Sequence, residues 1–453
     1  MERFVVQNFG CRASQADGAA IESSLSAKGL AQAGSVSDAQ LVVLNTCTVT
    51  STADEDVRQT VRRVNRENPA ARILVTGCYA QRAPEEIAGM PGVHWVVGNS
   101  HKTRIAEIVD EEAPDHGGVP YNGGVPYRGA PYHGMIHVGD IFEQADFLAA
   151  PVEDAAGDRT RPNLKIQDGC NNRCSFCIIP FVRGRSRSMP ADRVVAEIRN
   201  LAGRYREVVL SGINLGRWGR EPGSAITDSN QPRRLAGLLC RVLNETAIER
   251  IRISSVEPMD FSDDLLELMA GEPRIAKHVH APLQSGSDTV LRRMHRKYRP
   301  RHYEDRIRKA RALMPDAAIG ADVMVGFPGE TEEEFEQNRH VIASLPFTYL
   351  HVFTYSERPG TPAADRSDQV PMLVRKERNR VLRELAAEKN LAFRRTMVGR
   401  TLSVVTLDQG ALSDNFLKVD LAAPRAANQM LDVRIGAASA AGLREQAPLM
   451  VLE

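Results

Sequence analysis

The chain has 453 residues, which predicts two or three domains rather than one core. Hydrophobic residues make up 42% and charged residues 25%, as in an ordinary globular protein, and the net charge of +1 gives no overall attraction to nucleic acid. No apolar run approaches the roughly 18 residues that cross a bilayer, and the N-terminus lacks the pattern of a signal peptide, so we expect no membrane span and a cytoplasmic location.

The first hundred residues predict a doubly wound α/β domain. Short runs rich in Val, Ile and Leu are typical of buried parallel strands, and the intervening segments, such as residues 53–68, have helical spacing. The predicted strands lie within residues 3–10, 39–47, 71–78 and 93–99. Residues 112–135 are rich in Gly, Pro and Tyr, so we expect a loop or linker there.

A second alternating series begins near residue 163 and predicts six more strands, with helices between them at, for example, 191–201 and 301–313. The predicted strands lie within 163–169, 207–214, 250–258, 278–286, 319–329 and 349–356. Six such units indicate a partial TIM-like barrel whose chemistry lies at the C-terminal strand ends.

The rest of the chain predicts a long basic helix at 371–395 and then a small β-barrel. Its predicted strands lie within 401–410, 411–421 and 448–453. The whole chain is thus expected to be an α/β protein with four parts. They are an N-terminal domain (1–110), an insert and linker (111–158), the partial barrel (159–392) and the small β-barrel (393–453).

Seven cysteines in a chain without an export signal favour metal or redox chemistry over disulfides. Cys170, Cys174 and Cys177 have C-x3-C-x2-C spacing directly after the first barrel strand. Three thiolates on one loop suit three corners of a [4Fe–4S] cluster and leave the fourth iron open, whereas a structural zinc site would need a fourth ligand.

The second cysteine set is spread along the N-terminal domain. Cys11, Cys47 and Cys78 each follow one of the first three predicted parallel strands, and such strand ends share one edge of a doubly wound sheet. We therefore predict that the three converge on a second cluster, the alternative being that they are small buried core residues. Cys240 lies in an amphipathic helix, where a core position is expected.

Two cationic stretches, residues 292–311 and 375–395, are candidates for phosphate contacts, with a solvated helix face as the equal alternative.

These motifs resemble the methylthiotransferases of the radical S-adenosylmethionine (SAM) superfamily over nearly the whole chain. The resemblance is carried by NTCTVT, LKIQDGCNNRCSFCIIPFVRGRSRS, RISSVEP, HAPLQSGSDTVLRRMHRKY and DVMVGFPGETEEEF. Within the family they are most similar to the branch that converts N6-threonylcarbamoyladenosine beside the tRNA anticodon to its 2-methylthio derivative. The Gly/Pro/Tyr-rich insert near residues 119–135 departs from the family pattern.

The resemblance implies two [4Fe–4S] clusters, SAM, a tRNA substrate, a TRAM-type RNA-binding barrel, an electron donor such as flavodoxin or ferredoxin, and a sulfur source. It places the SAM-cleaving cluster on the C-x3-C-x2-C loop and the sulfur-carrying cluster on the other three cysteines. Candidates for contacts to SAM are Gln284, Ser285, Glu257 and Asp322, the last two also for ribose hydroxyls. Candidates for a tRNA phosphate or the acidic threonylcarbamoyl group are Arg183, Arg185 and Arg187.

Three other functions remain open at this stage. Sister branches carry out the same chemistry on isopentenyladenosine in tRNA or on an aspartate of a ribosomal protein. A protein of another class, a non-catalytic iron–sulfur protein that binds RNA, would keep its clusters for structure alone.

Overall fold

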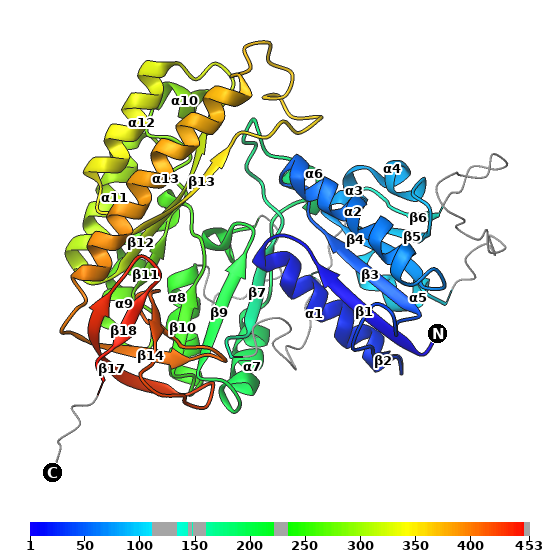
Figure 1. Cartoon of the computed structure of the whole chain (residues 1–453), viewed down its shortest axis with the longest axis horizontal. Helices are drawn as coiled ribbons and strands as arrows, with labels where there is room; N and C mark the ends of the chain where they lie inside the picture. The colour runs from blue at the N-terminus through cyan, green and yellow to red at the C-terminus, as the bar shows by residue number, and fades with distance from the viewer. Residues whose placement is uncertain (111–133, 144–146, 148–159, 222–233, 448–453) are drawn as a thin grey trace. The chain divides into compact units, whose positions relative to one another are not determined.

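The computed structural model describes residues 1–110, 134–143, 147, 160–221 and 234–447 (Figure 1). The chain forms two compact units. Unit 1 comprises Met1–Gly157, Asp168–Asn172 and Cys177–Arg187, and unit 2 comprises Asp158–Gln167, Arg173–Phe176 and Ser188–Glu453.

Unit 1 contains a six-stranded parallel sheet in the order β2-β1-β3-β4-β5-β6. Its strands are β1 (Arg3–Asn8), β2 (Ala31–Gln32), β3 (Leu41–Thr46), β4 (Arg72–Gly77), β5 (Val93–Gly98) and β6 (Met135–His137). Its helices are α1 (Arg12–Ala27), α2 (Ser51–Glu67), α3 (Cys78–Arg82), α4 (Pro84–Ala88), η1 (Lys102–Arg104), α5 (Ile105–Ile108) and α6 (Ile179–Arg183).

Both faces of this sheet are covered, which confirms the doubly wound prediction. Val42 and Leu44 of β3 pack in one core cluster with α2, whereas Leu41 and Val43 pack in the other cluster with α1. Because successive strand residues point to opposite faces, the run of apolar residues in β3 has a partner layer on each side. Residues 111–133 of the predicted insert lie outside the described residues, and strand β6 begins at its end.

Unit 2 contains the six strands that the sequence predicts for the partial barrel. Together with the short strand β8, which the sequence did not predict, they form two sheets, β10-β9-β7-β8 and β11-β12-β13. The six predicted strands pair in parallel within their sheets, and a bridge joins Ile251 of β10 to Ile275. The strands are β7 (Asn163–Asp168), β8 (Arg187–Ser188), β9 (Glu207–Gly212), β10 (Arg250–Ile253), β11 (His278–His280), β12 (Ala318–Val325) and β13 (Tyr349–Thr354).

The helices of unit 2 fall between these strands, as the alternation predicts (Figure 1). They are α7 (Ala191–Ala202), η2 (Leu215–Arg217), α8 (Leu235–Glu245), η3 (Pro258–Asp260), α9 (Asp263–Gly271), α10 (Asp288–Arg293), α11 (Pro300–Leu313), α12 (Glu332–Ser344) and α13 (Met372–Arg395). Helix α12 begins with a full capping box, in which Thr331 and Glu334 each bond the other's backbone N–H.

The C-terminal part of unit 2 is a closed barrel with strand order β14-β15-β16-β18-β17, as the small β-barrel prediction requires. Its strands are β14 (Thr401–Thr406), β15 (Ala411–Ser413), β16 (Lys418–Asp420), β17 (Met430–Ala438) and β18 (Leu443–Glu445). The sequence did not predict β17 and β18, and the predicted strand within 448–453 lies outside the described residues.

A buried ion pair joins the small barrel to the parallel strands of unit 2. Glu207 of β9 is fully buried and accepts hydrogen bonds from Nε and Nη2 of Arg252 at 2.7 and 3.1 Å. Arg252 also donates to the carbonyl oxygens of Ser413 and Asp414, each at 3.0 Å. Burial alone would raise the pKa of Glu207, but Arg252 and Arg250 hold it below its ordinary value, so the pair remains ionised.

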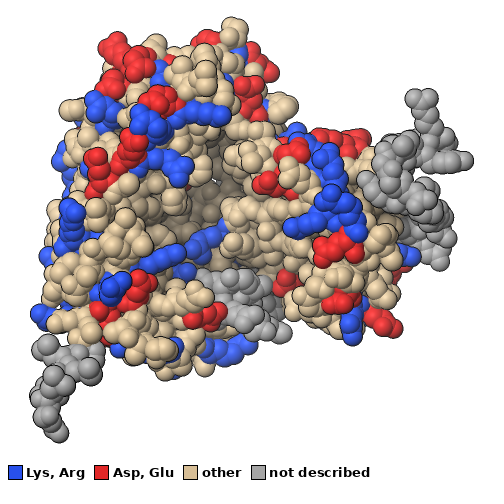
Figure 2. Space-filling model, in the orientation of Figure 1, with Lys and Arg blue, Asp and Glu red and all other residues tan. Residues whose placement is uncertain are grey.

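Two predictions about surface and core need correction. Cys240 is exposed, because the buried face of α8 is formed by its leucines and Val242 and position 240 falls outside that face. The prediction for the basic stretches needs correction at Arg296, Arg375 and Arg378, which are buried, whereas Arg292 and Arg308 are exposed. On the face seen in Figure 2, Lys and Arg side chains are interspersed with Asp and Glu.

Candidate iron–sulfur and substrate sites

In unit 1, three cysteines follow three neighbouring parallel strands. Cys11 lies three residues beyond the end of β1 and is the N-cap of α1, Cys47 follows β3, and Cys78 follows β4 and opens α3. Because β1, β3 and β4 are adjacent and parallel, these positions share one edge of the sheet.

The cysteine side chains at this edge are close together. A Cβ added to Gly10, which has φ +94°, would lie 2.7 Å from Sγ of Cys47, so only glycine lets the loop before Cys11 approach that thiol. Burial raises the pKa of Cys47 to about 12, and the neighbouring thiols of Cys78 and Cys11 also raise it. Asn99 donates to Sγ of Cys78 at 3.6 Å.

A buried charge network lies beside the three cysteines. Asp17 of α1 pairs with Lys102 and with Arg183, each at 3.0 Å, and Arg183 also pairs with Asp168 at 3.0 Å. All four side chains are less than a tenth exposed. The pKa of Arg183 is raised well above its ordinary value: burial opposes this, but the thiol of Cys78 and the two carboxylates outweigh it.

This network corrects the role expected for Arg183. The side chain is 2% exposed and paired with two carboxylates, so it is not available to a phosphate. Arg185 is exposed and Arg187 half-buried, so both remain candidates. The sequence did not predict Lys102, because nothing in the local pattern of a short helical turn shows that its ammonium group points into the core.

The C-x3-C-x2-C cysteines lie on the loop after β7, and all three are partly exposed. In unit 1, Cys170 N–H donates to the carbonyl of Gly184 at 3.1 Å, and Asn172 N–H donates to Sγ of Cys170 at 3.4 Å. In unit 2, Ser175 anchors the middle of the loop through its backbone N–H to Met294 at 3.1 Å.

Within unit 2, the buried side chain of Arg296 contacts Cys174, the middle cysteine of the loop. Nη1 of Arg296 donates to Sγ of Cys174 at 3.2 Å, and its Nη2 pairs with Glu257. Burial opposes ionisation, yet Tyr298, Glu257 and Cys174 hold the pKa of Arg296 well above its ordinary value. Glu257, predicted as a ligand contact, is thus bound to an arginine that the sequence had placed on a solvated or RNA-binding surface.

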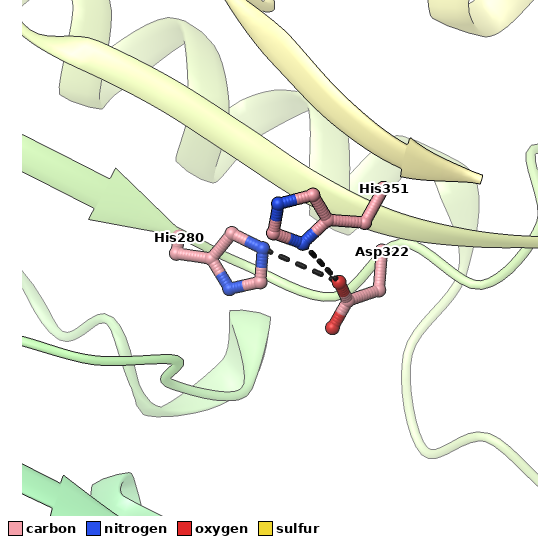
Figure 3. Close-up of side chains that lie close together, drawn as sticks. All are labelled: His280, Asp322 and His351. Atoms are coloured by element: carbon pink, nitrogen blue, oxygen red, sulfur yellow. Dashed lines mark hydrogen bonds and ion pairs between the residues drawn. The ribbon is translucent and has the colours of Figure 1, made fainter. Parts of the chain in front are cut away.

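Of the remaining predicted contacts, Gln284 and Ser285 follow β11 and Asp322 lies within β12. Gln284 adopts φ +62°, and its backbone N–H donates to the carbonyl of Asp322 at 2.8 Å. Ser285 is fully buried, and its Oγ accepts from Ser287 N–H at 3.2 Å, so its hydroxyl caps the loop. Asp322 projects between His280 and His351, from three adjacent strands (Figure 3).

Two family models match separate parts of the chain. Residues 164–342 match the radical SAM superfamily, and residues 3–98 match the uncharacterized protein family UPF0004. The first match spans the strands from β7 to β12, and the second spans the sheet that bears Cys11, Cys47 and Cys78.

Curated relatives cover most of the chain. The threonylcarbamoyladenosine tRNA methylthiotransferase MtaB of Bacillus subtilis is 41% identical over 78% of this chain and 73% of its own length. The protein of the same name from Aquifex aeolicus is 33% identical over 91% of this chain and 95% of its length. The tRNA-2-methylthio-N(6)-dimethylallyladenosine synthase of Pelotomaculum thermopropionicum is 34% identical over 89% and 86%.

A solved structure shares the fold. The radical S-adenosylmethionine methyltransferase TsrM of Kitasatospora setae superimposes with a TM-score of 0.54 at 15% identity, covering 80% of this chain and 77% of that one. Among the described helices, none combines the length and apolar character that a membrane span requires.

Proposed function

The chain belongs to the radical SAM methylthiotransferase family, and from this we propose that it converts N6-threonylcarbamoyladenosine beside the tRNA anticodon to its 2-methylthio derivative. The single observation that carries the substrate is the relative from B. subtilis, which is named for this reaction and is 41% identical, against 34% for a relative named for the dimethylallyl substrate. The family uses SAM and two [4Fe–4S] clusters.

We assign the SAM-binding cluster to Cys170, Cys174 and Cys177. The donor set fits: three thiols lie within eight residues of one partly exposed loop, which leaves one iron of a cubane open to a small molecule. Arg296 places a positive charge and a hydrogen bond on Cys174, as neighbouring groups commonly do around metal ligands.

We assign the second cluster to Cys11, Cys47 and Cys78. This donor set fits too, because the three thiols follow adjacent strands and lie close enough to raise the pKa of Cys47. The buried cations Arg183 and Lys102 would offset the negative charge of ligated thiolates. When bound, these clusters and SAM supply reductive SAM cleavage and the transferred sulfur.

Further parts of the proposal rest on the family resemblance and the positions of individual residues. Gln284, Ser285, Glu257 and Asp322 remain our candidates around SAM, the last two also for ribose hydroxyls. Arg185 and Arg187 remain candidates around the RNA. We propose a flavodoxin or ferredoxin as the electron donor, a separate sulfur source, and a cytoplasmic location. The domain functions follow the division at residues 1–110, 159–392 and 393–453, the last binding RNA.

Iron counting on the reconstituted holoenzyme tests the two assignments. We expect about eight irons per chain, from two cubanes. Cys47→Ala should remove roughly half of the iron and leave SAM cleavage in place, whereas Cys174→Ala should also remove roughly half but abolish 5′-deoxyadenosine formation. Cys240→Ala is the matched control and should change neither. If Cys47→Ala retained all of its iron, the second cluster site would be wrong.

Mass spectrometry of tRNA nucleosides tests the substrate. A strain that lacks this enzyme should lose 2-methylthio-N6-threonylcarbamoyladenosine and regain it with the intact gene. Loss of the methylthio-isopentenyl nucleoside instead would identify the sister substrate, and unchanged tRNA with a ribosomal protein that lacks the modification would identify the other branch. Failure of the reduced holoenzyme to cleave SAM would favour a non-catalytic RNA-binding protein.

A further inference from the structure

One face of the β11-β12-β13 sheet carries a continuous set of rings and one carboxylate. The strand register places His280, Gly320 and Tyr349 side by side, then Asp322 beside His351, then Met324 beside Phe353. Because side chains alternate between the two faces of a strand, these rows share one face. Exposure increases along the rows: His280 is buried, whereas His351 and Phe353 are exposed.

Gly320 allows close packing of side chains at the buried end of this face. A Cβ added to Gly320 would lie 2.0 Å from Cζ of Tyr349, so only the missing side chain lets that ring lie across β12. Tyr349 then stacks on His280 with ring centroids 5.8 Å apart, and its hydroxyl lies 2.6 Å from Nε2 of His278. These contacts fix the rings of Tyr349 and His280 beside the next row of the sheet.

The next row, formed by Asp322 and His351, is polar and carries the negative charge of the carboxylate. Oδ1 of Asp322 lies 3.2 Å from Nδ1 of His351 and 3.4 Å from Nε2 of His280 (Figure 3). His280 is oriented from behind by Ser255, whose Oγ lies 2.6 Å from Nδ1. Burial alone would raise the pKa of Asp322, but the two imidazoles hold it well below its ordinary value. Its Oδ2 has no hydrogen-bond partner within the part of the chain that the structure describes.

We propose that Asp322, His351 and Phe353 form the pocket for the target adenine nucleoside, which rests on the function proposed above. The purine stacks on the exposed ring of Phe353 and lies edge-on against that of His351, since the two rings are steeply inclined to each other, and Oδ2 of Asp322 accepts a hydrogen bond from an N–H or ribose O–H of the nucleoside. An unpaired RNA base is commonly recognised by aromatic stacking together with one or two polar contacts.

The contacts of Asp322, His351 and Phe353 favour a nucleoside over a metal ion or a phosphate as the ligand. Both imidazoles approach the same oxygen of Asp322, so they hold it in one orientation and leave its second oxygen for a donor. The exposed end is lined by aromatic rings, with His351 and Phe353 at 6.4 Å in edge-to-face contact, which offers a flat ligand more surface than it offers a metal ion. An anionic carboxylate there also selects a ligand that donates hydrogen bonds rather than a phosphate.

The test compares two synthetic anticodon stem-loops on the holoenzyme. One carries N6-threonylcarbamoyladenosine beside the anticodon, and the other has an abasic site at that position. By fluorescence anisotropy, Phe353→Ala and His351→Ala should each weaken binding of the first RNA by roughly 5- to 150-fold, the range for losing one stacked base. Binding of the abasic RNA should not change. His340→Ala, an exposed histidine on α12, is the matched control for His351.

Any other result would contradict the proposed nucleoside pocket. Equal weakening of both RNAs would assign the two residues to folding or to backbone contacts, and unchanged binding would remove them from the interface. Stoichiometric zinc in the wild type that is lost in His351→Ala would make the three side chains metal ligands. A wild-type enzyme that binds neither RNA would refute the proposed function and this inference with it, whereas the preceding results refute the inference alone.

Discussion

Replacing Arg183 by Met should destabilise unit 1 more than any exposed substitution. Arg183 and Lys102 face Asp17 and Asp168, so two buried cations balance two buried carboxylates. Methionine fills a similar volume but removes the positive charge that pairs with both Asp17 and Asp168. Breaking a buried pair by removing one member costs about 3–5 kcal/mol, because the remaining charge stays desolvated.

Amide hydrogen exchange of β3 and β4 measures this loss, since both strands are buried at the centre of the unit 1 sheet. A loss of about 3 kcal/mol in opening free energy corresponds to exchange about 150-fold faster. Arg185→Met, two residues away and exposed, is the control and should change exchange by less than about threefold, or roughly 0.5 kcal/mol. Repeating both in the Cys47→Ala background separates the charge effect from loss of a cluster.

The reasoning also predicts a rescue. Adding Asp168→Asn to Arg183→Met removes one of the two buried carboxylates that Arg183 balanced, so the double variant should exchange more slowly than the single one. If Arg183→Met exchanged like Arg185→Met, the network would contribute nothing to stability. If the double variant were less protected than Arg183→Met alone, buried charge would not be the cause.

Three further results are expected in unit 2. Gly320→Ala should lower stability by about 1–3 kcal/mol in thermal unfolding, because the new Cβ displaces the ring of Tyr349. Glu207→Gln should destabilise strongly at neutral pH; since the pKa of Glu207 is lowered from 4.5, this carboxylate stabilises the fold above that pH, and the gap between wild type and variant should narrow in acid. Arg296→Met should slow 5′-deoxyadenosine formation about 10- to 100-fold by removing a thiolate hydrogen bond.

Controls for these three variants are available in the same unit. Gly271→Ala should change stability by less than about 1 kcal/mol, since no atom lies within 4 Å of the added Cβ. A pH-independent gap for Glu207→Gln would mean that the ionised carboxylate is not what stabilises the fold. Arg292→Met, largely exposed on α10, should leave SAM cleavage unchanged. Equal slowing in Arg292→Met and Arg296→Met would contradict a specific contact to Cys174.

Structural features that depend on residues close together in the sequence could be predicted from it. The parallel strands are short apolar runs buried on both faces, and the cysteines that follow β1, β3 and β4 share an edge because parallel strands must place their ends there. Strand β17 was missed although Val433 and Ile435 alternate with polar residues as in a half-buried strand, and the closed barrel supplies its partner strands β14 and β18.

Burial of charge could not be predicted, because it depends on contacts distant in sequence. Arg183 meets Asp17, 166 residues away, and Arg296 meets Cys174, 122 residues away. In the sequence each is one basic residue among several, and a solvated or phosphate-binding role was the natural interpretation. The exposed position of Cys240, in contrast, could have been predicted, because Leu235, Leu239 and Val242 have the spacing of one helical face and position 240 lies outside it.

The ion pair of Glu207 with Arg252, together with the bonds from Arg252 and Arg250 to the small barrel, bears on how RNA would be positioned. Since Arg252 bonds two carbonyls of the small barrel and Arg250 donates to Ser403 at 2.7 Å, that barrel is fastened to β9 and β10 rather than carried on a flexible tether. If the small barrel binds RNA, as proposed above, it therefore holds that RNA at a fixed distance from β11–β13. On that proposal, the distance along the RNA from the barrel-bound segment would determine which nucleotide reaches those strands.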